Sequence, residues 1–542
     1  MNLYFALTIG PIYRTMGMAR STREIWLSSY IFSYLMATIC ESLKKYGEIL
    51  IPNVPEDTEL ANKYKNSQAG LFPDRLIMLC NKSDTSSKDL ILEIVQDKSI
   101  SILDDSLKED RGFLKQYKEY IQVYSVFIEI KEKENPIDIL FPILESLEQR
   151  PSYIEKYNGT HPILEKILLR ESKKKGIMGT DTPVAAYDDR IPSLIYKKEG
   201  IKFPSLQKIS RAETAEKEQP EMRYWNYPAY VQADGDGMGY FLHALFEVGG
   251  MKAVQKFSNF MFEYGYEATE QIVNYKGKPI YMGGDDMLFI APVKNGDTTI
   301  FCLIKNLNEL FNRMIQENED LLDSITEWNS SITKENKRKP IHPSISYSVF
   351  VAYYKYPMKE SLLSVRDLLF TTAKSMPGKN AVAFSLLKHS GHCVETCWSK
   401  NKKDKSSFYF FLEMIKEHIL VTDSFLNSLQ YKLKVLEPLL TRILVGRDNP
   451  FETGTPYSII SGCLPDESFR EYAFKNLTYN FFNEVVHDIK YRGFIDKMFY
   501  YLLFTYRELE DIYGNNGKTA KEAVNNLYTV LRFLHFLNKD NT

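Results

Sequence analysis

Two short acidic segments carry the residue types that could do chemistry in this chain. The first is Asp234-Gly-Asp-Gly-Met-Gly239 and the second is Gly283-Gly-Asp-Asp286. Carboxylate oxygens are the ligands that Mg²⁺ and Mn²⁺ take when they also engage substrate phosphates. If the fold brings the two segments together, we predict that Asp234, Asp285 and Asp286 are catalytic metal ligands. Asp236 is a further metal ligand in this interpretation.

The second acidic segment lies between two apolar runs with strand composition, 280–282 and 287–291. The paired glycines Gly283 and Gly284 supply the positive φ that a tight turn needs, so the pattern predicts a β-hairpin. Successive strand side chains point to opposite faces. Asp285 and Asp286 would therefore share one metal only if the turn twists them together, or a second metal or a lysine would engage one of them. A solvated hairpin tip without chemistry is the alternative.

The first acidic segment follows a predicted strand, Ala229–Ala233, and leads into a helical run. Asp234 and Asp236 would share one face if the strand persists, with no side-chain bulk between them at Gly235. Glycines such as Gly237 and Gly239 would let a triphosphate approach the start of the helix, where free N–H groups attract anions. An EF-hand is excluded because no Glu closes a twelve-residue loop.

Two lysines are candidates for holding phosphates. An amphipathic helix is predicted over about 360–376, and a turn follows at Gly378-Lys-Asn380. Lys374 and Lys379 lie where cations could meet a triphosphate. The alternative is that each is a solvated lysine near a helix end, interacting with carbonyl groups.

The remaining sequence is that of a water-soluble protein with several structural units. Its 542 residues exceed one core, and 68 basic residues against 70 acidic ones exclude a strongly basic nucleic-acid binder. Six scattered cysteines fit reduced thiols in the cytoplasm. Cys393 and Cys397, with His389 and His392 nearby, lack the second cysteine pair of a structural zinc site. We see no signal peptide or membrane span.

Further elements follow from periodicity and turn residues. They are strands at 3–9, 71–80, 124–130 and 344–352, helices over 14–45 and 298–328, a charged loop at 334–339, and helices at Leu426–Val445, Tyr472–Arg492 and Phe494–Leu509. Gly514-Asn-Asn-Gly-Lys-Thr519 lacks the spacing of a phosphate loop, and Thr519 with Glu522 predicts a capping box instead. His487-Asp488 lacks the histidine set of a metal phosphohydrolase.

On these residues the chain resembles the large polymerase/cyclase subunit of type III CRISPR effector complexes, in its Cmr-type branch. The two acidic segments look like that subunit's metal-site motifs. Ala373-Lys374 with Gly378-Lys-Asn380 is similar to the phosphate-contacting segment of diguanylate cyclases. Four further segments look like the subunit's first, degenerate palm: Thr8-Ile-Gly-Pro11, Ala19-Arg20, Leu27-Ser-Ser-Tyr30 and Phe72-Pro-Asp-Arg75.

The resemblance implies an α+β fold with two ferredoxin-like palm domains, the first degenerate and the second with GGDD, plus a connecting helical region and a C-terminal helical bundle. The implied boundaries are 1–150 for the first palm, 151–225 for the connecting region, 226–398 for the catalytic second palm and 399–542 for the bundle. Gly10-Pro11 replaces an acidic strand end, and Phe72–Arg75 has one acid rather than two. The first palm should therefore shape a nucleotide pocket without holding the catalytic metals.

The resemblance also implies an activity. Recognition of foreign RNA by the guide-directed complex would switch on the second palm, which would convert ATP, with Mg²⁺ or Mn²⁺, into an adenylate messenger. That messenger is cyclic oligoadenylate in most relatives, whereas some relatives without an HD nuclease domain join AMP to S-adenosylmethionine. This chain begins directly at the first palm, so we expect no HD nuclease activity, and both products stay open. A catalytically silent scaffold subunit is the alternative.

The expected partners follow from the same resemblance. They are the other Cmr-type subunits, CRISPR RNA and target RNA. Among the subunits we expect backbone subunits, a small subunit bound through the C-terminal helices, and a subunit that binds the 5′ end of the guide. We expect no membrane partner.

Overall fold

The computed structural model describes residues 1–54, 64, 67–103, 105–150, 204–212, 222–333, 338–401, 406–417, 421–446, 466–481 and 489–538. Most of the predicted connecting region, much of the charged loop and His487-Asp488 lie outside these residues. The chain divides into two compact units. Unit 1 comprises Met1–Glu213, Tyr230–Ile345 and Lys355–Leu363, and unit 2 comprises Thr214–Ala229, Ser346–Tyr354 and Ser364–Thr542.

The first palm segment forms a four-stranded antiparallel sheet in unit 1, in the order β2-β3-β1-β4. Its strands are β1 (Asn2–Gly10), β2 (Gly47–Ile51), β3 (Arg75–Cys80) and β4 (Gln122–Ile130). The helices of this segment are α1 (Ile12–Met16), α2 (Thr22–Leu43), α4 (Thr85–Ser99), α5 (Asp105–Glu109), α6 (Arg111–Tyr120) and α7 (Pro136–Glu148). This order of helices and strands is that of a ferredoxin-like fold.

The predicted helix over 14–45 is two helices, because the chain breaks at 17–21. Helix α2 restarts after Ser21, whose side chain accepts a hydrogen bond from the Glu24 N–H at 3.2 Å. Its apolar face is long and includes the buried Trp26 and Leu35. Strand β2 and helices α4, α6 and α7 were not foreseen in the sequence.

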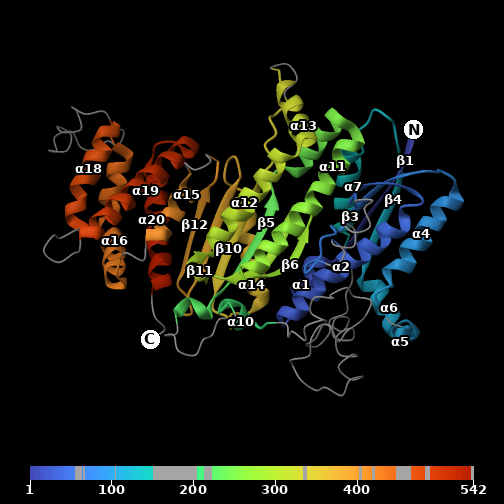
Figure 1. Ribbon diagram of the computed structural model, residues 1–542, viewed down its shortest axis with the longest axis horizontal. Helices are drawn as coiled ribbons and strands as arrows, with labels where there is room; N and C mark the ends of the chain where they lie inside the picture. The colour runs from blue at the N-terminus through green and yellow to red at the C-terminus, as the bar shows by residue number, and fades with distance from the viewer. Residues whose placement is uncertain are drawn as a thin grey trace. The chain divides into compact units, whose positions relative to one another are not determined.

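The part of the second palm in unit 1 repeats the pattern. Its strands follow each other in the order β5-β7-β6: β5 (Pro228–Gly235), β7 (Asp286–Pro292) and β6 (Lys278–Gly283). They are accompanied by α11 (Met238–Asn274), α12 (Ile300–Glu317), α13 (Glu319–Ser330), α14 (Met358–Asp367), the short α10 (Leu206–Ser210) and the small pair β8 (Lys294–Asn295) and β9 (Thr298–Thr299). Helix α11, green in Figure 1, packs on β6 and α12.

Unit 2 contains three strands in the order β12-β11-β10: β12 (Cys393–Ser399), β11 (Ala381–Leu387) and β10 (Ile345–Ala352). A 3₁₀ turn, Arg223–Asn226, and a π-helical turn, Leu368–Ala373, also belong to it. Its helices are α15 (Ser407–Glu417), α16 (Asp423–Val445), α18 (Asp466–Phe481), α19 (Ile489–Tyr513) and α20 (Gly517–Asn538). Buried aromatic residues such as Trp398 and Phe411, whose rings stack at 4.1 Å, fill its core.

Two predictions about these helices are wrong. The boundary predicted near Arg492 does not exist, because α19 runs from Ile489 through the exposed Gly493. Thr519 is not the cap of a capping box. The Asn516 side chain accepts from the Thr519 N–H at 3.0 Å, so the helix starts directly after that asparagine, at Gly517. Amide and hydroxyl side chains serve equally at this position, and the sequence pattern alone did not separate them.

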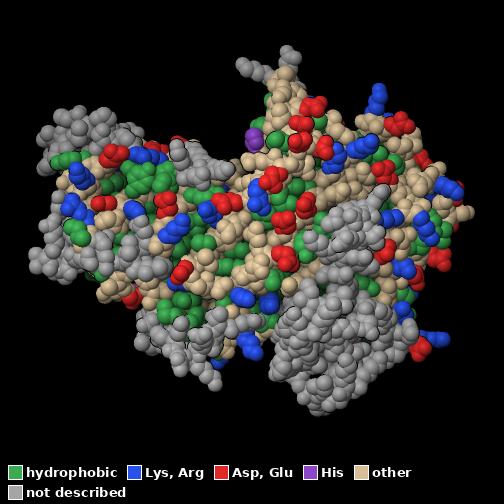
Figure 2. Space-filling view, in the orientation of Figure 1, with side chains coloured by type: hydrophobic (Ala, Val, Ile, Leu, Met, Phe, Trp, Pro, Cys, Tyr) green, Lys and Arg blue, Asp and Glu red, His purple; other side chains and the backbone are tan. Residues whose placement is uncertain are grey.

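The α+β class and the helical C-terminal part are confirmed. The four predicted domain ranges stay a prediction, and the two units follow a different division. In the described part of the chain, no helix is long and apolar enough to span a membrane. Figure 2 shows acidic and basic side chains interspersed on the visible face, as expected from a net charge of -2.

Candidate active site

The predicted acidic hairpin is present in unit 1. Gly283 pairs with Asp286 across β6 and β7, which leaves Gly284 and Asp285 as a two-residue turn. Gly284 has φ 63°, whereas Asp285 has no positive φ. Positive φ at the first central residue alone is the type II′ pattern, in which glycine takes that position. Only one of the two glycines is therefore required by the turn geometry.

Gly283 is needed for a different reason. A Cβ added there would lie 2.4 Å from the Tyr281 hydroxyl oxygen and 2.5 Å from its Cζ. The Tyr281 ring thus lies directly over Gly283. It is buried, and its pKa is raised by that burial and by Asp74, Asp286, Tyr13 and Asp285. The tyrosine therefore forms part of the base of the acidic site.

The two acidic segments meet at the end of β5. A Cβ added to Gly235 would lie 2.8 Å from the Asp285 Cβ and 2.5 Å from the Met238 Cγ. Glycine is required because Asp285 and Met238 occupy the space that a side chain would fill. Gly237, at φ 68°, and Gly239 have nothing within 4 Å of an added Cβ, so the start of α11 is open there.

The adjacent aspartates separate onto two sides. Asp285 lies against Gly235, whereas the Asp286 Oδ2 accepts a hydrogen bond from the Tyr13 hydroxyl at 3.3 Å. The same hydroxyl accepts from Gln232 Nε2 at 3.4 Å. Asp234 follows Gln232 by two residues on β5 and takes the same side of the strand. Asp234 and Asp286 therefore lie on one side of β5, and Asp285 lies on the other.

Asp236 is placed differently from the other three acids. It lies beyond the last residue of β5, its N–H donates to the Ser344 carbonyl, and its Oδ2 accepts from the Ser344 hydroxyl, both at 2.8 Å. This aspartate therefore fixes the segment before β10. Its predicted share in metal binding stays a prediction.

Like charges accumulate at the hairpin. Burial, and then the neighbouring Asp286, raise the pKa of Asp285 to about 7. Burial raises the pKa of Asp74 to about 6, with Glu148 and Asp286 adding to the rise and Arg75 opposing it. A carboxylate pKa rises in this way when the negative form has too little compensation. A divalent cation would supply that compensation, so these residues fit a metal.

The described residues do not make a complete metal cage. No group of three or more His, Cys, Asp or Glu residues among them has an arrangement that could hold a metal ion by itself. Mg²⁺ commonly takes one or two carboxylates and completes its coordination with water and substrate phosphates. Asp285 and Asp286 suit that use.

The sequence did not point to Tyr13 and Gln232, and it assigned Asp74 no place beside the second acidic segment. Asp74 precedes β3 as Asp285 precedes β7, and its carbonyl accepts from the Ile9 N–H at 2.9 Å. Gly70, which precedes Asp74, connects the first palm to the acidic hairpin, because the Met282 N–H donates to the Gly70 carbonyl at 3.0 Å. The matching positions of Asp74 and Asp285 before their strands were the available signal.

Lys374 and Lys379 lie in unit 2 and close to each other. Burial, and then the charge of Lys379, lower the pKa of Lys374 to about 7. Lys379 and Asn380 both have positive φ, at 50° and 48°, and the Lys400 N–H donates to the Asn380 carbonyl at 2.8 Å. Half-buried Lys374 is therefore not a solvated helix-end lysine.

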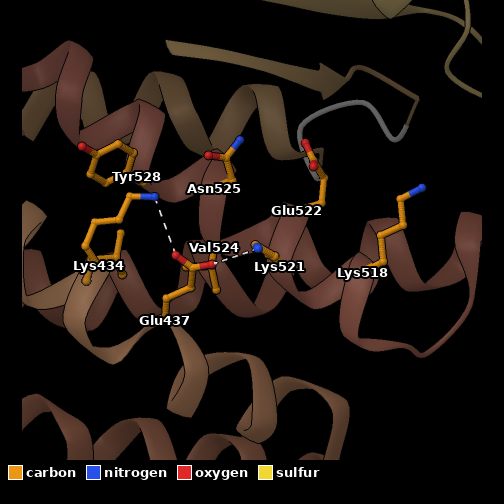
Figure 3. A pocket seen from close by; sticks show the side chains of 9 residues that line it. Lys434, Glu437, Lys518, Lys521, Glu522, Val524, Asn525 and Tyr528 are labelled. Atoms are coloured by element: carbon orange, nitrogen blue, oxygen red, sulfur yellow. Dashed lines mark ion pairs between the residues drawn. The ribbon is translucent and has the colours of Figure 1, made fainter. Parts of the chain in front are cut away.

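Two other features of unit 2 do not form a comparable site. Cys393 and Cys397 lie on β12, where Cys393 contacts the Ser385 hydroxyl and Cys397 contacts Met376. A cavity of about 180 Å³ lies between α16 and α20. Glu437 forms ion pairs there with Lys434, at 3.6 Å, and with Lys521, at 3.8 Å. The dashed lines in Figure 3 mark these two pairs, in which the charges compensate each other.

Known protein families match both palm segments. Residues 227–383 match the model of Cas10/Cmr2, second palm domain, and residues 4–110 match that of CRISPR-associated protein Cmr2, N-terminal. The two matched segments are those of the Cas10/Cmr2 family. The matched ranges include β1, α2 and β3 of the first palm and the acidic hairpin of the second.

The individual proteins similar to this chain share a short alignment or a low sequence identity with it. It is 30% identical over 134 residues to CRISPR system Cmr subunit Cmr2 of Pyrococcus furiosus, an alignment that takes in 25% of this chain and only 13% of that relative. A structure of the type III-B Cmr-beta complex bound to cognate target RNA matches at 13% identity and TM-score 0.49, covering 81% of this chain and 76% of the other. A Csm1–Csm4 cassette in complex with cA4 matches at 10% identity and TM-score 0.44, with coverages of 93% and 70%.

Proposed function

We propose that this chain is the nucleotidyltransferase of a type III, Cmr-type RNA-guided complex, and that it makes an adenylate messenger from ATP at the acidic hairpin. The observation that carries the proposal is the burial of Asp285 beside Asp286 and Asp74, which raises the pKa of Asp285 to about 7. A protein gains nothing in stability from such crowding, and perturbed carboxylates of this kind cluster at functional sites. The family membership of both palms agrees with it.

Asp285, Asp286 and Asp234 would hold Mg²⁺ or Mn²⁺. The bound metal would neutralise triphosphate charge and favour attack of a ribose hydroxyl on the α-phosphate, which breaks the bond to the β-phosphate and releases pyrophosphate. The chain's own residues orient the acids: Gly235 lets Asp285 approach β5, and Tyr13 fixes one oxygen of Asp286.

The open start of α11 offers a place for phosphates. Nothing lies within 4 Å of a Cβ added at Gly237 or Gly239, so no side chain crowds the start of the helix, where the first N–H groups can bind anions. Gly283 and Gly284 keep the turn compact beneath the acids. Lys374 and Lys379 supply a further phosphate-binding candidate, because burial and the neighbouring Lys379 lower the pKa of Lys374, and a bound anion would favour its charged form.

The proposed partners are the other Cmr-type subunits, CRISPR RNA and target RNA. The Cmr-beta structure named above was determined with target RNA, and the family match of both palm segments supports the same setting. ATP is the proposed substrate. The product is cyclic oligoadenylate or AMP joined to S-adenosylmethionine.

The test uses the assembled complex with cognate RNA, labelled ATP and Mg²⁺ or Mn²⁺, with and without S-adenosylmethionine. We expect a new adenylate product by mass spectrometry that requires cognate RNA and metal. A product that appears only with S-adenosylmethionine identifies the conjugate. Consumption of no ATP under any condition would leave a scaffold subunit and would refute the proposed function.

A further inference from the structure

Tyr13 connects two strands of the second palm to a residue of the first. Its hydroxyl donates to the Asp286 Oδ2 at 3.3 Å and accepts from the Gln232 Nε2 at 3.4 Å. The three side chains thus form one continuous hydrogen-bond relay. Asp286 belongs to β7, Gln232 belongs to β5, and Tyr13 belongs to α1.

The position of Tyr13 is set by the first palm. Helix α1 is only five residues long and cannot hold a side chain firmly by itself. Thr15, also on α1, anchors the helix. Its hydroxyl donates to the Pro11 carbonyl at 2.6 Å and shares a 2.5 Å hydrogen bond with the Tyr120 hydroxyl. Tyr120 ends α6, so α1 is fixed to the body of the first palm.

The relay restrains Asp286, the acid that lies on the same side of β5 as Asp234. A hydrogen bond to one carboxylate oxygen limits the side-chain rotamers of the aspartate. The donor belongs to the first palm, so the orientation of Asp286 depends on where the first palm holds Tyr13. The sequence alone gave the first palm no such role in the second.

We propose that Tyr13 is a positioning residue for Asp286, and that through it the first palm sets the catalytic geometry of the second. This inference rests on the proposed nucleotidyl transfer. Tyr13 would not hold the metal or the nucleotide. Its effect would be on turnover and on the metal requirement, with little effect on ATP binding.

The experiment replaces Tyr13→Phe in the full chain, assembled in its complex with cognate RNA. This change removes only the hydroxyl. Since a hydrogen bond to a charged group is among the stronger ones, we expect kcat to fall about tenfold. We also expect the KM for ATP to stay within about twofold and the Mn²⁺ concentration for half-maximal rate to rise, because binding by the other groups is retained.

The matched control is Tyr117→Phe. Tyr117 also lies in the first palm, and its hydroxyl donates to the Ser99 carbonyl at 2.9 Å, away from the acidic hairpin. We expect it to keep the wild-type kcat and metal response. A second variant, Gln232→Leu, removes the other end of the relay. Combined with Tyr13→Phe, it should cost less than the product of the two single effects.

The outcomes separate this inference from the proposed function. If the wild-type complex is active and the Tyr13→Phe variant has the same kcat and metal response, the positioning role is wrong and the proposed function stands. A variant with a raised KM and an unchanged metal response also overturns it, because Tyr13 would then act in ATP binding. A wild-type complex that makes no product under any condition overturns the proposed function itself.

Discussion

The two acidic turns of unit 1 differ in the residue that opens the strand after them. In the first palm, Asp74 is followed by Arg75 at the start of β3, and in the second, Asp285 is followed by Asp286 at the start of β7. Arg75 donates two hydrogen bonds of 2.9 Å to the Glu148 carboxylate. The first turn therefore carries its own cation, whereas the second carries a second acid.

This difference separates a structural turn from a reactive one. Burial is the first cause of the raised pKa at both Asp74, which reaches about 6, and Asp285, which reaches about 7; Asp286 adds to both rises and Arg75 opposes both. At the first turn the Arg75 charge is itself paired with Glu148 and Glu145. The second turn keeps negative charge that an external cation could neutralise. The duplicated fold has thus kept its geometry in both palms and the adjacent pair of acids in one.

The prediction with the largest expected effect removes both acids of the second turn. Asp285→Ala combined with Asp286→Ala should lower product formation by at least about 10³-fold, because metal ligands stabilise the transition state by several kcal/mol. Mass spectrometry of the product and size-exclusion chromatography of the complex measure activity and assembly separately. We expect assembly to be unchanged.

A matched control for the double variant removes another adjacent acidic pair. Glu319→Ala with Asp320→Ala deletes two exposed carboxylates at the start of α13 in the same unit. This control should retain its product. Wild-type synthesis by the Asp285 and Asp286 variant would remove the distinction between the two turns.

The second test alters the shape of the reactive turn and leaves its charge alone. Gly283→Ala places a Cβ 2.4 Å from the Tyr281 hydroxyl oxygen, so the ring or the hairpin must move. Overpacking of this kind costs about 1–3 kcal/mol of stability. We expect a lower Tm and a kcat reduced about tenfold or more, since small displacements of reacting groups are costly.

The control for this glycine is Gly493, an exposed residue of α19. Gly493 has nothing within 4 Å of an added Cβ, so Gly493→Ala should raise stability by up to about 1 kcal/mol. Normal activity and Tm in Gly283→Ala would mean that the Tyr281 ring does not constrain the turn.

The sequence predicted the reactive hairpin because its signals are local. Paired glycines between apolar runs specify a tight turn, and the adjacent acids are visible at its tip. The resemblance added the two palms and the missing second acid of the first. What escaped prediction depends on contacts between distant segments. Tyr13 reaches Asp286 across 273 residues of chain, and nothing near Tyr13 in the sequence indicates that contact.

Helix ends and side-chain roles were also hard to foresee. The same Gly-Asp pattern predicted positive φ at both hairpin glycines, whereas only Gly284 has positive φ and Gly283 makes room for Tyr281. Asp236 matched Asp234 by spacing, yet it bonds Ser344 beyond the strand end. Local patterns specify elements well, but they do not state which neighbour fills the space beside a side chain.

A third prediction tests the compensated turn. Arg75→Ala removes the bidentate pair with Glu148 and a 3.6 Å ion pair with Glu145. Since these groups are partly exposed, we expect a loss of about 1–2 kcal/mol in stability, measured as a lower Tm of the full chain. Arg75→Lys should recover part of it, because lysine keeps the charge without the planar fork. An unchanged Tm in Arg75→Ala would show that the first turn does not depend on its cation.

The smallest expected effect concerns the lysine pair of unit 2, where burial and a neighbouring like charge act on the cation Lys374. The folded chain releases the Lys374 proton near pH 7, whereas the unfolded chain holds it to about pH 10.5. The unfolded state therefore binds more protons between these values, and stability rises with pH in that window. Lys374→Met should lose this rise. We expect the Tm difference between the variant and the wild type to change by on the order of 1–3 °C from pH 7 to pH 9. Lys416→Met, which removes an exposed lysine of α15, should show no such change. A pH-independent difference for Lys374→Met would mean that Lys374 stays charged throughout, and that the lysine pair, unlike the acidic hairpin, is compensated within the protein.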